Sequence, residues 1–153
     1  METHTFACFI PHLVKNNKNI PFSLEDETLI HRLKNVLRLE SGESILVFNR
    51  DFQATFEIRE FLKKSIQGTL SACFPHEQKA GRKVTVFLPL LKKEHLQDAL
   101  YGLCEIGVQV IQLVHVQKAH VKIWSAKDQE KAEKIIISAA EQSKNFTYPH
   151  ALS

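Results

Sequence analysis

Short apolar runs separated by polar residues dominate the first half of the chain. They predict four strands, at residues 5–10, 44–49, 53–61 and 65–74. Residues 53–59 alternate between polar and apolar, as expected of a strand with one buried face. Lys63 and Lys64 lie between two of these runs and predict a hairpin turn. Strands this short and this closely spaced favour a small β-barrel or sandwich.

One helix is expected among these strands. Leucine, isoleucine and valine recur at helical spacing over residues 29–37 and form an apolar stripe. Ser23 is the predicted N-cap, and the acidic residues that follow it suit the positive end of a helix dipole. Ser41 and Gly42 predict a turn after the helix.

The second half follows a different pattern, in which continuous apolar stretches alternate with helical stripes. This pattern predicts a strand, a helix, a strand and a helix at residues 84–90, 94–106, 108–116 and 127–143. The apolar run that begins at Val84 predicts a strand covered on both faces. Strands alternating with helices in this way indicate βαβ units and a parallel sheet.

A polar segment with proline and glycine separates the two patterns, at residues 75–83. We therefore expect two units, at 1–75 and 84–153, joined by a linker at 76–83. A parallel sheet normally has more than two strands. The chain ends at Ser153, ten residues after the last predicted helix. The α/β sheet is therefore expected to be incomplete.

Composition narrows the class of protein. With 44% hydrophobic and 24% charged residues, the chain is typical of a globular protein, and it has no run of about 18 apolar residues to predict a membrane span. The net charge of +3 arises in the second half, and this small excess permits a nucleic-acid partner without requiring one. Three widely spaced cysteines among apolar residues predict buried thiols in a reducing cytoplasm.

Few motifs indicate chemistry by themselves. The five glycines are scattered and form no phosphate-binding loop. His115 and His120 are five residues apart, which is no recognised ligand spacing, so no metal site is predicted. Trp124, the only tryptophan, is expected to pack rather than to bind a ligand. The basic residues of the first predicted helix, Lys34 among them, could line a phosphate track, or they could form a solvated polar face opposite the apolar stripe.

Three segments taken together resemble one family. Residues 31–39, followed by Gly42 and residues 45–48, are similar to the "H…VLR…G…L-F" signature of the RsmE family. Residues 105–108 with Ile111 resemble its "ELGV..I", and residues 139–143 with Lys134 and Pro149 resemble its "W.KI..AAEQS.R..VP". The order and spacing agree across residues 5–150.

The resemblance implies both a fold and an activity. Members of this family are 16S rRNA uridine-N3 methyltransferases that use S-adenosylmethionine. The implied fold is a small PUA-like β-barrel that grips RNA, followed by the first half of a SPOUT-type α/β domain, with the C-terminal knot absent from this chain. The family binds its cofactor in the knot, whose "GPEGG" and "LG..ILR.ETA" motifs do not occur here. The implied partners are 16S rRNA, the small ribosomal subunit and, in the full-length family, a second copy of the protein.

The residues expected to contact the RNA backbone are His31, Arg32, Arg38, Lys63, Lys64, Lys92 and Lys93. No residue is identified as the catalytic base. The family's "SERS" loop falls on residues 116–119, a family Lys falls on Gly102, and a family Arg falls on Asn145. These differences change residues that the family is expected to use for RNA positioning and dimer contacts. Arginine offers a planar fork of hydrogen-bond donors that glycine and asparagine lack.

Three functions remain open at this point. The first is S-adenosylmethionine-dependent methylation of uridine N3 in 16S rRNA, for which this chain alone would be inactive. The second is a non-catalytic RNA-binding module, whose affinity should fall steeply with salt. The third is a truncated remnant of the enzyme, whose unpaired sheet edge should favour dimerisation or aggregation.

Overall fold

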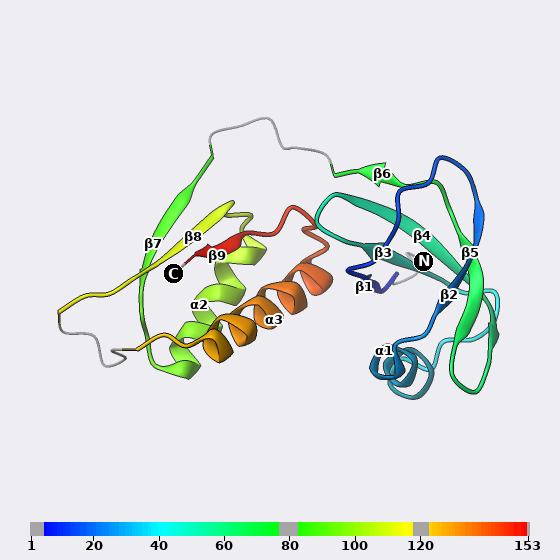
Figure 1. Cartoon of the computed structure of the whole chain (residues 1–153), viewed down its shortest axis with the longest axis horizontal. Helices are drawn as coiled ribbons and strands as arrows, with labels where there is room; N and C mark the ends of the chain where they lie inside the picture. Colours follow the sequence, from blue (N-terminus) through cyan, green and yellow to red (C-terminus); the bar gives the residue numbers. More distant parts are fainter. Residues whose placement is uncertain (1–4, 77–82, 118–122, 153) are drawn as a thin grey trace. The chain divides into compact units, whose positions relative to one another are not determined.

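The computed structural model describes residues 5–76, 83–117 and 123–152. The chain divides into two compact units, Met1–His76 and Glu77–Ser153. In the described residues the first unit contains a six-stranded sheet and the second a three-stranded sheet, so the chain is a mixed α/β protein (Figure 1).

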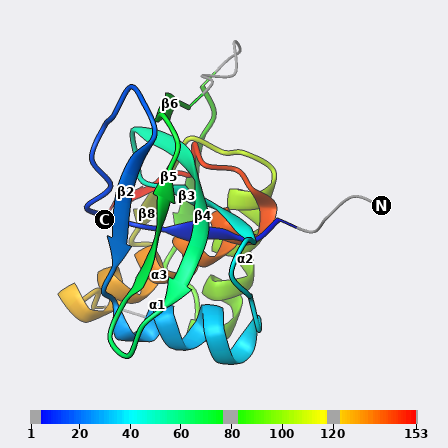
Figure 2. The ribbon, with the colours of Figure 1, turned by 90° about the vertical axis from the view of Figure 1, so that its right-hand side faces the viewer.

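The first unit is built on strands of very different length. They are β1 (Ala7–Phe9), β2 (Ile20–Leu24), β3 (Ser44–Phe48), β4 (Phe52–Phe61), β5 (Ile66–Leu70) and β6 (Phe74–Pro75). Their order is β1-β3-β4-β5-β2, with β6 paired to β4 (Figure 2). The four predicted strands are confirmed, although the last one divides into β5 and β6. The sequence pattern does not predict β2.

Close packing of β5 against β4 shapes the core of this unit. A Cβ atom at Gly68 would lie 2.2 Å from the carbonyl oxygen of Glu57 and 2.6 Å from two ring atoms of Phe56. Only glycine therefore allows the two strands to approach this closely. The pairing shifts register between Ile58 and Glu60, which indicates a bulge in β4. The fully buried core side chains include Leu33, Ile45, Phe56, Ile58, Ile66 and Leu70.

The helix of the first unit begins later than predicted, and only its first part is an α-helix. The prediction of Ser23 as N-cap is wrong, because Ser23 lies in β2 and pairs with Gln67 of β5. The N-cap is Asp26, whose Oδ1 accepts a hydrogen bond from the Leu29 N–H at 2.8 Å. Helix α1 (Glu27–His31) continues directly as a π-helix, η1 (Arg32–Val36). At its end the Leu37 N–H donates to the carbonyl oxygen five residues earlier, at 2.9 Å.

The second unit alternates strands and helices as predicted. Its elements are β7 (Thr85–Pro89), α2 (Lys93–Glu105), β8 (Val110–Val114), α3 (Ala126–Ser143) and β9 (His150–Leu152). The three strands are parallel and follow the order β7-β8-β9. The sequence pattern does not predict β9, because three residues give no measurable periodicity.

Both helices of the second unit cover the same face of its sheet. The strands follow one another in a single direction, and right-handed connections then place α2 and α3 on one side, where they pack together. Ile111 and Ala151 are buried on that side, whereas Phe87 of β7 is 69% exposed and Val84 is 48% exposed. The prediction that the strand at Val84 is covered on both faces is therefore wrong for the described residues.

Buried thiols contribute to both cores. Cys8, Cys73 and Cys104 are free and buried, which confirms the prediction from their apolar neighbours. Burial, with a smaller effect from the Glu105 carboxylate, raises the pKa of Cys104 to about 11. Cys104 therefore stays neutral and behaves as a small apolar side chain between the two helices.

Two glycine substitutions should shift stability in opposite directions. Gly68→Ala should destabilise the first unit by about 1–3 kcal/mol, because its Cβ would overlap with β4. Gly102→Ala lies inside α2 with no atom within 4 Å of the new Cβ, so it should stabilise the second unit by about 0.5–1 kcal/mol. Urea unfolding measures both effects, with circular dichroism reporting on both units and the fluorescence of Trp124 on the second unit. An unchanged unfolding midpoint for Gly68→Ala would show that β5 can move away from β4.

Candidate nucleic-acid interface

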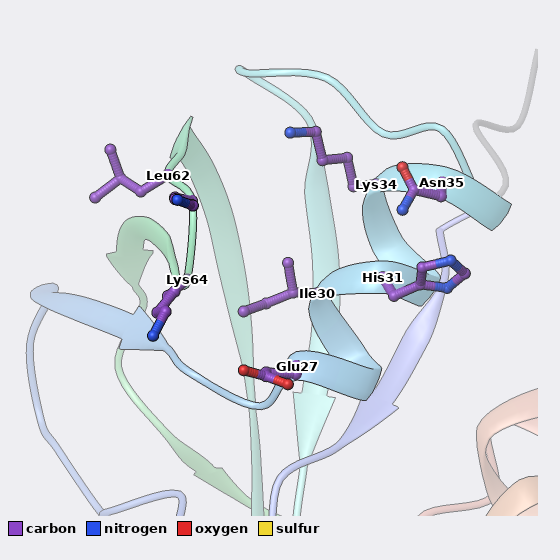
Figure 3. Close-up of a pocket in the computed structure, with 8 residues that line it drawn as sticks. Glu27, Ile30, His31, Lys34, Asn35, Leu62 and Lys64 are labelled. Carbon is purple, nitrogen blue, oxygen red and sulfur yellow. The ribbon is translucent and has the colours of Figure 1, made fainter.

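A groove on the first unit collects several of the predicted basic residues. It lies between the helical segment α1–η1 and the turn that joins β4 to β5, and it has a volume of about 300 Å³. Figure 3 shows the side chains that these two elements contribute to it. The residues that line the groove are Glu27, Ile30, His31, Lys34, Asn35, Leu62, Lys63 and Lys64.

The helical side of the groove is held in place by its apolar stripe. Ile30 and Leu33 are buried in the core of the unit, so the polar residues between them are exposed at the surface. Lys34 and Glu27 extend towards the turn, while the ring of His31 points to the other side of the helix (Figure 3). Lys34 is therefore better placed than His31 to meet a ligand in the groove.

The opposite side is a tight hairpin turn. The Leu62 N–H donates to the Ser65 carbonyl at 2.9 Å, which closes the turn and places Lys63 and Lys64 at its tip. This confirms the turn predicted from the two lysines. Leu62 is 41% exposed and adds an apolar contact surface at the edge of the groove.

The groove has an excess of positive charge. Three lysines line it against one carboxylate, that of Glu27. Within the described part of the chain, the amino groups of Lys34, Lys63 and Lys64 have no ion-pair partner. Exposed lysines that are not neutralised by the protein are suited to phosphate groups. An apolar edge beside them offers a surface for a sugar or a base.

The structure brings together only part of the predicted set. His31, Lys63 and Lys64 line the groove. Arg32 begins η1 and Arg38 follows its end, but neither lines the groove. Lys92 and Lys93 lie at the start of α2 in the second unit. Glu27 and Asn35 also line the groove but were not predicted, because the sequence does not distinguish them from other exposed polar residues of this segment.

Arg38 has an unusual backbone conformation. Its φ angle is +53°, in the left-handed region that favours glycine. The next N–H, that of Leu39, donates to the Leu33 carbonyl at 3.0 Å and ends the helical segment. A side chain at such a position costs about 1 kcal/mol, and the exposed guanidinium of Arg38 makes no contact that would offset this cost in the described residues. Lys144, with φ of +55°, has a similar left-handed conformation at the C-cap of α3.

In the second unit, the position of a family arginine has a structural role. Asn145 donates from Nδ2 to the Cys104 carbonyl at 2.9 Å, and its Oδ1 accepts from Thr147 at 3.0 Å. It thereby joins the end of α3 to the end of α2. Val116 and Gln117 are exposed after β8. The rest of the segment matched to the "SERS" loop, and His120, lie outside the described residues.

The described residues form neither a metal cluster nor a membrane-spanning helix. Residues 5–76, 83–117 and 123–152 contain no group of three or more histidine, cysteine or acidic side chains that could hold a metal ion. No helix in these ranges is both long and apolar enough to cross a membrane.

The second unit is similar to a known family of domains. Residues 77–152 match the family model described as an RNA methyltransferase domain. No curated protein matches the sequence.

Solved structures show a similar fold. A ribosomal RNA small subunit methyltransferase E from Neisseria gonorrhoeae, bound to S-adenosylmethionine, has a TM-score of 0.81 and 22% identity, over 98% of this chain and 61% of its own. A Legionella pneumophila protein described as a methyltransferase, also with S-adenosylmethionine, has a TM-score of 0.79 and 22% identity, over 97% and 62%. The chain thus spans about three fifths of the length of these relatives.

Replacing Arg38 by glycine should separate binding from stability. Arg38→Gly relieves the left-handed strain and should raise the free energy of unfolding by up to about 1 kcal/mol. If Arg38 contacts phosphate, the same variant should bind an RNA oligonucleotide several-fold more weakly in fluorescence anisotropy. Lys144→Gly is the matched control, because it relieves the same strain and removes one positive charge in the second unit. Equal RNA affinities of the two variants would show that Arg38 does not contact the RNA.

Proposed function

We propose that this chain, whose residues 77–152 belong to the RNA methyltransferase domain family, binds RNA through the groove of its first unit and serves S-adenosylmethionine-dependent RNA methylation. The observation that carries the proposal is the set of three lysines that face the groove without an ion-pair partner in the described residues. A basic groove in the same chain as a domain of this family is suited to positioning an RNA substrate.

Two observations support a more specific RNA substrate. The Neisseria gonorrhoeae relative is a ribosomal RNA small subunit methyltransferase, and the sequence motifs resemble a family that methylates uridine N3 in 16S rRNA. We therefore propose 16S rRNA as the RNA and N3 of uridine as the methylated atom. The same resemblance supports a PUA-like first unit, a SPOUT-type second unit, a homodimer and a cytoplasmic location.

The described residues do not fit S-adenosylmethionine. The methyl donor carries a positive sulfonium and an adenosine, and sites for ligands of this size usually measure about 300–1,000 Å³. The groove of the first unit is lined by three lysines. A cavity in the second unit has a volume of only about 130 Å³ and is flanked by Lys93 and Lys131. Each of these linings has more lysines than carboxylates and disfavours the net positive charge of the methyl donor, so we propose that the cofactor site lies outside the described residues.

This misfit favours a second candidate function. A non-catalytic RNA-binding module needs the groove but no cofactor site. The two candidates predict different results when a second polypeptide supplies the rest of the relatives' length. Only the enzyme would then transfer a methyl group.

Removing the two lysines of the turn tests RNA binding. Lys63→Gln/Lys64→Gln should weaken binding to protein-free 16S rRNA and lower the slope of log K against log salt by about 0.7–1 per lost phosphate contact. The control is Lys15→Gln/Lys18→Gln, which removes the same charge from an exposed loop of the same unit. Filter binding at several salt concentrations measures both. An unchanged slope for the turn variant would contradict the proposal.

Calorimetry with S-adenosylmethionine tests the location of the cofactor site. The 153-residue chain should show no measurable heat of binding, because its described cavities are too small or too positive. Addition of 16S rRNA should not change this result if the site lies elsewhere. Micromolar affinity for the chain alone would place the site within it and would favour the enzyme over the binding module.

A further inference from the structure

A second cavity lies on the second unit, where the N-terminal ends of α2 and α3 meet. Its volume is about 130 Å³. Leu96 and Ala132 are buried side chains of the two helices, and Leu91 and Ile135 complete an apolar lining. Trp124 also lines the cavity and stays partly exposed, so its indole is accessible to a ligand.

Trp124 is held in place by a short hydrogen-bond chain. Its Nε1 donates to Oε1 of Gln129 at 3.0 Å. The amide nitrogen of Gln129 donates in turn to the Ala151 carbonyl of β9 at 2.8 Å. One glutamine therefore fixes the indole against the backbone of the sheet. An aromatic ring immobilised in this way can stack on a ligand without a further loss of side-chain freedom.

The rim of the cavity is positively charged. Lys93 and Lys131 line it, and the carboxylate of Asp128 lies beside them. That carboxylate accepts hydrogen bonds from the hydroxyl and the N–H of Ser125, at 2.6 and 3.1 Å, as part of the α3 capping box. Asp128 is therefore engaged by the helix start, and Lys131 lies close enough to contribute to the lowering of its pKa. The rim keeps an excess of positive charge, which favours an anion.

We propose that this cavity binds one pyrimidine nucleotide, with its ring on Trp124 and its phosphate between Lys93 and Lys131. An apolar cavity of about 150 Å³ holds a benzene molecule, so the volume here suits a single six-membered ring and not a purine. Stacking on an aromatic side chain beside basic residues is a common way to hold a base of single-stranded RNA. The inference builds on the proposed RNA-binding function and adds a specific contact in the second unit.

The chemistry of the cavity disfavours other occupants. A helix or peptide segment from another protein needs a longer apolar groove than one that holds a single ring. A cationic ligand would be repelled by the two lysines. An inorganic anion would have no use for the apolar lining or for the fixed indole.

Because Trp124 is the only tryptophan, its fluorescence reports directly on the site. Titration with uridine 5′-monophosphate should give saturable quenching at concentrations up to about 10 mM. Uridine, which lacks the phosphate, and adenosine 5′-monophosphate, which has a larger base, should bind more weakly. Inorganic phosphate should not quench. The absence of saturable quenching by uridine 5′-monophosphate, or equal quenching by phosphate alone, would overturn the proposal.

Variants separate this site from the groove of the first unit. Lys93→Gln/Lys131→Gln should weaken the binding of uridine 5′-monophosphate several-fold, whereas Lys134→Gln should leave it unchanged. Lys134 lies on the same helix outside the cavity and pairs with Glu130. Trp124→Ala should lower the affinity for uridine 5′-monophosphate about tenfold or more, as measured by ligand-observed NMR. Lys63→Gln/Lys64→Gln should not change the affinity for uridine 5′-monophosphate. The proposal for the groove and the proposal for this cavity are therefore tested by different results.

Discussion

The close approach of β5 to β4 at Gly68 is the constraint on which the first unit depends. It seals the core around Phe56 and fixes the path of the two strands towards their turn. The same core receives Ile30 and Leu33 from the helical segment. The turn and the helix are therefore positioned by one packed interior, and the groove between them inherits its shape from that interior. A binding surface assembled in this way needs no contact between its own polar residues.

The second unit is held together differently. Its parallel strands depend on two helices that cover one face, and side-chain amides tie the ends of these helices to their surroundings. Asn145 joins the end of α3 to the end of α2, and Gln129 joins Trp124 to β9. These hydrogen bonds stabilise the edges of a sheet whose other face carries exposed Phe87. In proteins with parallel sheets both faces are normally covered. This face is therefore the part of the sheet that the described residues of the unit cover least.

Periodicity predicted most elements, because strands such as β4 and helices such as α3 bury one face over many residues. It failed where pairing across the fold decides the outcome. Ser23 has the chemistry of a helix cap, but its pairing with Gln67 places it in a strand. The same limit applies to the groove. The turn at Lys63 and Lys64 was predicted from the local sequence, whereas its position opposite Lys34 arises only from tertiary packing. Leu96 and Trp124 are far apart in the sequence and no local pattern relates them, so the cavity of the second unit could not be predicted.

The π-helix η1 has a consequence for how this segment tolerates changes in length. A π-turn holds about one residue more than an α-turn, so it accommodates an insertion without displacing the ends of the helix. Deletion of one residue between Arg32 and Val36 would leave the Asp26 cap and the Leu39 hydrogen bond able to form around an ordinary α-helix. Because the ends of the helix would keep their positions, both the fold and the alignment of the helix with the turn should survive such a deletion.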